Sequence, residues 1–534
     1  RVRGAELIQS VAWIAGGVTL FCFVSAYVKA AVAGRITRQR ALPLLVLGVA
    51  GWALVLGIGA VLGKTLKTEV AARTFAPKAK AAGPNIILCA ADALRADYLR
   101  VYSPEAKAAT PAMDAFAKDA VTFRQAFAQA SWTKPSFGTI FTGRYPEAHR
   151  ATTKTGMLSA EIPTLAGALS DAGYYARGFA NNPNIMTVFG FDRGFSDYTD
   201  LKPEPLFGAS DASMRLALYQ VMRKVFLTAE GKVRRGRLRI TDFYQPAETV
   251  TDEALRWVDS GARPKDAPFY LFLHYMDTHD PFMDYNNPGV GYARARMEHP
   301  DPDKYLDKMR NAYVSDIEHL DTHLARLLDG LKQRGLYDNT LIVFTADHGE
   351  EFFDHNGWWH GQTLYNEVVQ VPLIVKLPGN ARAGESNGDL ARLIDLAPTM
   401  LQFAGQPPVS GMSGQPLFDG QGNFSNAGIA WSYAENDFED NILQAVRSGE
   451  NTLIHANEEN PRGTKPVELY DRRADPAEKA NLAGKPELAE TQQQLDKVLA
   501  DYRRASAENA PEPAAPAQMD AATVEQLKAI GYLK

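Results

Sequence analysis

The chain is poor in cysteine and carries no surplus of positive charge. These two features argue against several classes of protein and of binding site. Its 534 residues include two cysteines, Cys22 in an apolar run and Cys89 in a predicted strand, which argues against a disulfide framework and a thiolate metal site. Lys and Arg total 57 against 62 Asp and Glu, for a net charge of -5, so nucleic acid is not expected as a partner. The length favours a large domain with appendages.

Histidine is also scarce, and its distribution is uneven. Three of the ten histidines fall within one segment, Leu341–Gly361. The segment begins with an apolar run, Leu341–Phe344, which predicts a strand buried on both faces of a parallel sheet. Ligands bind at the carboxyl ends of such strands, and the polar residues there are Asp347, His348, Glu350, His355 and His360. Carboxylates with imidazoles suit a divalent metal, although a charged, His-rich surface loop remains an alternative.

Two uncharged apolar runs, residues 8–28 and 41–63, lie near the start of the chain. Each reaches the roughly 20 residues that cross a bilayer, and the second follows too directly for the first to be a cleavable signal peptide. We therefore predict a transmembrane helical hairpin over residues 1–66 rather than two buried soluble helices. The chain begins at Arg1 without methionine, which leaves open whether residues precede it.

The charges around these runs bear on orientation. The loop between the runs carries Lys29, Arg35, Arg38 and Arg40, which favours a cytoplasmic loop. The domain that follows is then expected to be periplasmic or extracellular and tethered to the membrane, although Lys64 and Lys67 weaken the signal. Residues 67–83, rich in Ala and Lys, are expected to form a linker.

From residue 84 onward, predicted strands and helices alternate as in an α/β domain. The expected strands cover residues 85–90, 174–180, 268–276, 341–344 and 371–376, and the expected helices cover 163–172, 303–334 and 395–401. Pro135 and Gly143 favour a short helix over residues 136–143. Thr133 lies just before it, where N–H groups and the helix dipole attract an anion and a hydroxyl beside a metal ionises more easily. Threonine is also a common N-cap.

Other predicted strand ends also carry chemistry. Asp92 follows the strand at 85–90 and His279 follows the strand at 268–276. His274 lies inside the latter strand, where a lone histidine is more often structural. Asn181 directly follows the strand at 174–180 and is a candidate for substrate binding.

The sequence divides into several parts beyond the amino-terminal runs. We expect a catalytic domain over residues 84–405 and a smaller α+β subdomain over 406–504, with strands near 429–433, 443–446 and 452–455 and a helix near 486–503. Residues 505–534 are expected to form a linker and a short amphipathic helix, 524–533, able to dock back on the body.

Five motifs together resemble the sulfatase branch of the alkaline phosphatase superfamily. They are AADALRADYL, SWTKPSFGTIFTG, LHYMDTHDPF, DNTLIVFTADHGEEFFDHNGWWHG and ELYDRRADPAEKANL. The resemblance covers roughly Pro84 to Asp501 and implies a mostly parallel sheet flanked by helices. It further implies that Asp92, Asp347 and His348 are metal ligands, that Thr133 is the nucleophile and touches the metal, and that His279 and His360 bind the transferred group or a second metal.

The chain also departs from the sulfatase pattern. Sulfatases carry Cys or Ser at the nucleophile position, which becomes formylglycine, followed by x-Pro-Ser-Arg, whereas this chain has Thr133-Lys-Pro-Ser-Phe137. The paired aspartates usual at the first metal strand are reduced to Ala91-Asp92, there is no Gly-Lys-Trp-His segment, and Asp347-His348 stands where many sulfatases have Asp-Asn. The Thr, Asp-His-Gly-Glu and Trp-His-Gly signatures are instead similar to membrane-anchored phosphoethanolamine and phosphoglycerol transferases. The tail motif Glu468-Leu-Tyr-Asp471 resembles sulfatases.

We therefore expect a membrane-anchored, metal-dependent phosphoester hydrolase or phosphotransferase that forms a phosphothreonine at Thr133. His279 and His360 complete the catalytic set, and Lys134, His274 and Asn181 are expected to contact substrate. The cofactor is one divalent ion, Zn, Mn, Ca or Mg, with room left for a second. The substrate is a phosphate or sulfate ester, with lipid- and glycan-linked esters both open. A sulfatase without formylglycine and a non-catalytic membrane-tethered binding module are the alternatives.

Overall fold

The structure is a computed structural model that describes residues 81–203 and 237–533. The chain divides into two compact units, and the larger comprises Phe75–Lys202, Arg239–Met519 and Gln526–Lys534. Of the smaller unit, residues 203, 237–238 and 520–525 are described. All contacts discussed below lie within the larger unit.

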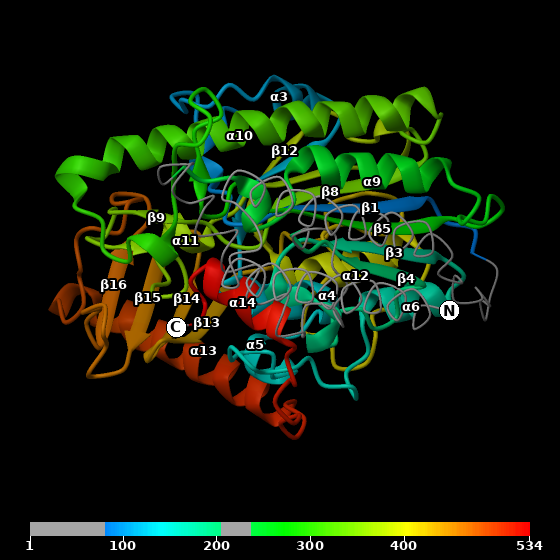
Figure 1. The fold of residues 1–534 in the computed structure, drawn as a ribbon. Coiled ribbons are helices and arrows are strands. Elements are labelled where there is room, and N and C mark those ends of the chain that lie inside the picture. Colours follow the sequence, from blue (N-terminus) through cyan, green and yellow to red (C-terminus); the bar gives the residue numbers. More distant parts are fainter. Residues whose placement is uncertain (1–80, 204–236, 534) are drawn as a thin grey trace, which may run out of the picture. The chain divides into compact units, whose positions relative to one another are not determined.

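An eight-stranded sheet forms the centre of the larger unit (Figure 1). The strand order is β12-β2-β11-β8-β1-β5-β3-β4. The bounds are β1 Asn85–Ala91, β2 Val121–Phe127, β3 Tyr175–Ala180, β4 Asp197–Asp200, β5 Phe269–Tyr275, β8 Thr340–Ala346, β11 Leu373–Lys376 and β12 Ser386–Arg392. Strand β11 runs antiparallel to both of its neighbours, β2 and β8, and the other pairs are parallel. The sheet is therefore mixed, with one reversed strand in an otherwise parallel arrangement.

Helices cover both faces of this sheet (Figure 1). One face carries α3 (Pro111–Lys118), α9 (Ala247–Asp259) and the long α10 (Pro302–Gln333), and the other carries α4 (Thr133–Thr142), α6 (Leu165–Asp171) and α12 (Leu396–Phe403). Burial on both faces explains why β5 and β8 consist mainly of apolar residues and why every residue in them is buried. Helix α10 begins where predicted because Asp301 caps it and Pro302 takes its first position.

Short elements lie between these helices and strands in the sequence. They are α5 (Pro146–His149), α11 (Asn366–Val369), β6 (Phe282–Met283), β7 (Gly291–Tyr292), β9 (Glu351–Phe352) and β10 (Trp358–Trp359). Strand β9 pairs with β10 and β6 with β7, both antiparallel.

A second, four-stranded antiparallel sheet follows in the sequence. It comprises β13 (Ser432–Phe438), β14 (Asn441–Arg447), β15 (Asn451–Ala456) and β16 (Val467–Asp471), paired in that order. Helix α13 (Ala489–Glu508) packs on one face of it through Leu495 and Leu499. The short helix α14 (Ala521–Ala529) follows near the end of the chain.

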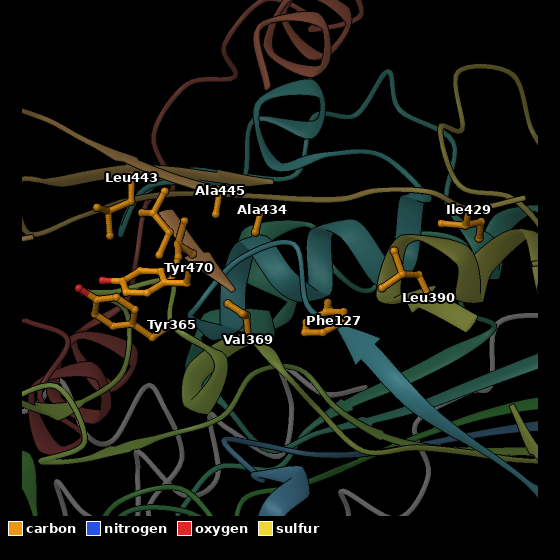
Figure 2. Close-up of a cluster of buried hydrophobic side chains, with 11 residues drawn as sticks. Phe127, Tyr365, Val369, Leu390, Ile429, Ala434, Leu443, Ala445 and Tyr470 are labelled. Carbon is orange, nitrogen blue, oxygen red and sulfur yellow. The ribbon is translucent and has the colours of Figure 1, made fainter. Parts of the chain in front are cut away.

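A buried hydrophobic cluster joins the second sheet to the region beside the central one (Figure 2). Its members come from β2, α11, β12 and all four strands of the second sheet or their flanks, namely Phe127, Leu364, Tyr365, Val369, Leu390, Ile429, Ala434, Leu443, Ala445, Ile454 and Tyr470. Because burial of such side chains contributes about 1.5–3 kcal/mol each, this cluster fixes the second sheet against the central one.

The structure contradicts the predicted membrane localisation. Among residues 81–203 and 237–533, no helix is both long enough and apolar enough to cross a bilayer. The longest described helix, α10, alternates apolar and charged residues because one side packs on the domain and the other faces solvent. The apolar runs at 8–28 and 41–63, on which the predicted hairpin rested, lie outside the described residues.

Candidate active site

Three elements deliver polar side chains to one place. Strands β1 and β8 are parallel neighbours in which Ala91 pairs with Ala346. Asp92 and Asp347, the next residue on each strand, therefore emerge side by side at the carboxyl edge of the sheet. Helix α4 starts at Thr133, directly beside them.

Asp92, Asp347 and His348 form a buried group suited to a metal ion. One ligand atom from each lies within 4.8 Å of the others, and all three side chains are fully buried. Asp92 Oδ1 and Asp347 Oδ2 have no hydrogen-bond partner among the residues that the structure describes. His348 Nδ1 donates to the Gly349 carbonyl at 2.8 Å, which leaves Nε2 free to act as a ligand, 3.4 Å from both of those carboxylate oxygens. Buried carboxylate oxygens without donors are what a divalent cation requires.

The ionisation of these groups supports the same conclusion. Burial and the Asp92 carboxylate raise the pKa of Asp347 well above its usual value. Burial disfavours ionised Asp92, but His279, His274 and His348 outweigh it and lower the pKa of Asp92 overall. Burial lowers the pKa of His348 to about 4, so its imidazole is neutral near pH 7. A cation would allow both carboxylates to ionise.

The backbone around the carboxylates is fixed by further contacts. Ala93 has a φ of 59°, which is uncommon for a residue with a side chain, and this turn directs its N–H to Asp347 Oδ1 at 3.2 Å. Hydroxyls from neighbouring elements hold the two carbonyls: Thr278 donates to that of Asp92 and Ser136 to that of Asp347, each at 2.6 Å. These contacts hold the ligand positions in place before any ion binds.

Thr133 is the first residue of α4 and is buried beside this group. Its Oγ1 lies 3.5 Å from Asp92 Oδ2 and 3.5 Å from His348 Nε2. The N-cap of α4 is Trp132, so the Thr133 hydroxyl does not serve as the cap. It faces the metal group instead.

Two further histidines, His279 and His360, lie close to the metal group, and the rings of His348 and His360 are 4.4 Å apart between centroids. His279 Nδ1 donates to the Asp280 carbonyl at 2.7 Å, and its buried Nε2 has no hydrogen bond. His360 Nδ1 donates to the Glu350 carboxylate at 3.1 Å, and its Nε2 accepts from the Tyr532 hydroxyl at 2.8 Å. The two rings lie 4.9 Å apart between centroids. Each of these two histidines thus has Nδ1 engaged, and of the two only His279 has an Nε2 without a hydrogen-bond partner among the described residues, because Tyr532 occupies Nε2 of His360.

The other predicted site residues are placed differently. His274 Nε2 lies 3.3 Å from Asp92 Oδ2, so it supports the ligand from within β5. Lys134 Nζ donates to three backbone carbonyls, those of residues 153, 154 and 156. The Asn181 side chain exchanges two hydrogen bonds with the Gln245 backbone. His355 contacts Glu367 and the Glu478 carbonyl.

Two residues of the site were not among those predicted. Asn182 Nδ2 donates to Asp92 Oδ2 at 2.7 Å and lies 3.3 Å from Thr133 Oγ1. The end of β3 was a recognisable signal, but adjacent strand residues face opposite ways, and the sequence did not show which of Asn181 and Asn182 faces the ligands. Tyr532 contacts the site from the segment after α14. The sequence analysis predicted that this segment could dock on the domain, but it did not predict a contact with the site.

Comparison with known proteins identifies the family of the chain. The Sulfatase family model matches residues 84–406, more than half of the chain, and the model "N-sulphoglucosamine sulphohydrolase, C-terminal" matches residues 354–505. The first match contains β1, α4, β5 and β8 with the residues they position. Enzymes of this family depend on metal ions, and the buried group described above is a suitable place for one.

The chain aligns with different fractions of the length of its individual relatives. N-acetylglucosamine-6-O-sulfatase of Bacteroides thetaiotaomicron is 30% identical over 39% of this chain and 38% of its own length. The multifunctional alkaline phosphatase superfamily protein PehA of Trinickia caryophylli is 26% identical over 76% of this chain and 92% of its own length. The phosphonate monoester hydrolase of Agrobacterium radiobacter has the same fold, with a TM-score of 0.61 at 23% identity over 79% of this chain and 96% of that one. The chain belongs to the sulfatase family of the alkaline phosphatase superfamily and is a hydrolase of sulfate or phosphate esters.

Proposed function

We propose that the chain is a metal-dependent phosphoester hydrolase or phosphotransferase whose nucleophile is Thr133. The observation that carries the proposal is the position of Thr133 Oγ1, 3.5 Å from both Asp92 Oδ2 and His348 Nε2 in a fully buried site. A hydroxyl beside a metal group and at a helix N-terminus is activated for attack.

The metal would be held by Asp92, Asp347 and His348. A divalent ion bound there lowers the pKa of the neighbouring hydroxyl and neutralises charge on the transferred group. Two carboxylates balance one divalent ion, which supports a single tightly held ion. A second would need His279 and His360 as ligands.

The reaction proceeds in two displacements on phosphorus. The Thr133 hydroxyl oxygen forms a bond to phosphorus and gives up its proton, the bond from phosphorus to the ester oxygen breaks, and the departing alcohol takes up one proton, so that no net proton is gained or lost. Water or an acceptor alcohol then attacks the phosphothreonine and frees Thr133. Under this proposal His279 and His360 act in the imidazolium form, in which Nε2–H would hold the non-bridging oxygens or supply a proton. The proposal is supported by the Nδ1 contact that orients each ring and by the Asn182 amide, which donates to Asp92.

The identity of the nucleophile favours phosphate over sulfate. Formylglycine hydrate expels sulfate by collapsing to an aldehyde, whereas an ester on threonine must be attacked by a second nucleophile. Position 133 is threonine, which cannot become formylglycine. The phosphothreonine route fits this requirement.

A sulfatase without formylglycine is the second candidate. It is favoured by the match of residues 354–505 to an N-sulphoglucosamine sulphohydrolase region and by the identity to an N-acetylglucosamine-6-O-sulfatase. Under this alternative Thr133 would carry a sulfate ester.

The test compares an aryl phosphodiester with the matching aryl sulfate on the metal-loaded chain. We expect a far higher kcat/KM for the phosphodiester. Thr133→Ala should abolish turnover and phosphothreonine formation, measured by mass spectrometry of quenched enzyme, while Thr133→Ser, which keeps the hydroxyl, should retain part of both. Thr133-dependent turnover that favours the sulfate would reject the phosphoester assignment in favour of the second candidate.

A further inference from the structure

The last residues of the chain pack against the nucleophile. Among the described residues of the larger unit, Leu527, Ile530 and Tyr532 are each 1% exposed. After α14 the chain turns at Gly531, whose φ is 79°, a conformation that glycine adopts without strain. The turn is closed by the Tyr532 N–H, which donates to the Leu527 carbonyl at 2.9 Å. This turn directs the Tyr532 side chain into the site.

The Tyr532 hydroxyl lies between the nucleophile and a catalytic histidine. It is 3.3 Å from Thr133 Oγ1 and 2.8 Å from His360 Nε2. Its ring is surrounded by the rings of Trp132, Phe438 and His279, with centroids 5.9–6.2 Å away. The Tyr532 side chain is therefore held by polar contacts of its hydroxyl and by packing of its ring.

This position is the one that substrate must occupy. An atom under attack approaches its nucleophile to about 3–3.5 Å, and the Tyr532 oxygen already stands within that distance of Thr133 Oγ1. The other neighbours of Oγ1 are permanent parts of the site, namely Asp92, His348 and Asn182, at 3.3–3.5 Å. Tyr532 is the one neighbour of Oγ1 in this set that does not belong to the metal group or its support.

The site is also closed to solvent in this arrangement. Thr133 and His279 are fully buried and His360 is 1% exposed. The Tyr532 hydroxyl also occupies His360 Nε2, so a substrate group could contact that nitrogen only after Tyr532 has left. Tyr532 and a tetrahedral oxyanion therefore exclude each other.

We propose that the segment Gln526–Leu533 is an intramolecular plug, in which the Tyr532 hydroxyl takes the place of an oxygen of the transferred group and must leave before substrate binds. The proposal rests on the function proposed above, because it takes Thr133 as the nucleophile. The segment comprises about eight residues, and local opening of a short segment costs less free energy than global unfolding.

The segment is also tethered close to the site. The Ala517 N–H donates to the Thr155 carbonyl at 2.9 Å, so the chain before α14 is held while the end swings out. A short tether gives a high effective concentration and returns the plug after turnover. The plug therefore lowers apparent affinity for substrate by the fraction of molecules in the open state.

Binding of inorganic phosphate to the metal-loaded full-length chain tests this directly. If about 90% of molecules are plugged, Tyr532→Ala should tighten phosphate binding about tenfold, measured by calorimetry, and raise kcat/KM for the aryl phosphodiester by a similar factor. Tyr532→Phe keeps the ring and loses the hydroxyl contacts, so it should fall between wild type and Tyr532→Ala. Lys528→Ala changes an exposed residue of the same helix and should match wild type.

Hydrogen exchange supplies a readout independent of turnover. In the wild type, saturating phosphate should increase amide exchange in residues 526–533, because bound oxyanion expels the segment. Unchanged or slower exchange there would overturn the proposal, as would weaker phosphate binding by Tyr532→Ala. If the proposed ester chemistry is wrong, turnover fails in every variant, whereas the binding and exchange measurements still report on the plug.

Discussion

The Asn182 side-chain amide donates to Asp92 Oδ2 at 2.7 Å, and it does so beside the strand end where this chain has Ala91-Asp92 in place of paired aspartates. A neutral donor on Asp92 orients the carboxylate without adding negative charge. The metal group therefore has two carboxylates and one neutral imidazole, which suits one divalent ion.

Replacing Asn182 should weaken the metal site. Asn182→Ala removes the donor that orients Asp92, and we expect metal affinity to fall by roughly 10- to 100-fold, measured by competition with a chelator. Asn181→Ala is the matched control, because that side chain bonds only the Gln245 backbone. It should leave metal affinity unchanged and lower the free energy of unfolding by about 1–3 kcal/mol. The reverse pattern would contradict the placement of Asn182.

Asp347 should be required for metal binding. We expect about one divalent ion per purified chain, because the two carboxylates Asp92 and Asp347 balance one such charge, and Asp347→Ala should lose it, as measured by elemental analysis. Asp501→Ala, at a half-exposed position on α13, controls for the loss of a carboxylate. An Asp347→Ala protein with full metal content would refute the assignment.

The site could be predicted from sequence where each residue follows a continuous buried strand. The runs that became β1, β5 and β8 are mainly apolar, and parallel strands bring their ends to one edge, so Asp92, His279 and Asp347 could be expected to converge. Each apolar run can be recognised from a few neighbouring residues, and its place in a parallel sheet fixes where the next residue emerges.

Other features depend on information that local patterns lack. Helix α4 begins at Thr133 and not at Ser136, because proline is tolerated throughout the first helical turn, where N–H groups have no intrahelical acceptor. Strand β16 was not predicted, because residues 468–471 were interpreted only as part of the tail motif that resembles sulfatases. Tyr532 lies 399 residues from Thr133, and their contact arises only from tertiary packing.

Lys134 should prove to be structural and not selective for substrate charge. Its ammonium group donates to the carbonyls of Thr153, Lys154 and Gly156 at 2.7–3.3 Å, within a fully buried environment. Lys134→Met should therefore lower the free energy of unfolding by roughly 1–3 kcal/mol, measured in urea. The ratio of phosphodiester to sulfate kcat/KM should stay the same. A fall in that ratio without loss of stability would show that Lys134 contacts substrate.

His149 should make stability depend on pH. The side chain is fully buried under α4, where Nε2–H donates to the Pro135 carbonyl at 3.0 Å and Nδ1 accepts from the Ala151 N–H at 3.2 Å. A proton on Nδ1 would face that N–H directly. There is no room for the ring to move toward α4, because even a Cβ on Gly138 would lie 2.4 Å from His149 Cε1.

Burial lowers the pKa of His149 from 6.5 to about 3 in the folded protein. Between these two values the unfolded chain binds a proton that the folded chain does not, so stability rises with pH in this window. The contribution is fully present above about pH 6.5 and is lost by about 1.4 kcal/mol per pH unit below it. Urea unfolding of the wild type and His149→Gln between pH 4.5 and 7.5 measures this contribution as the difference in slope. Because glutamine can make both hydrogen bonds without titrating, the variant should lose stability less steeply on acidification, and equal slopes would show that His149 is not the group responsible.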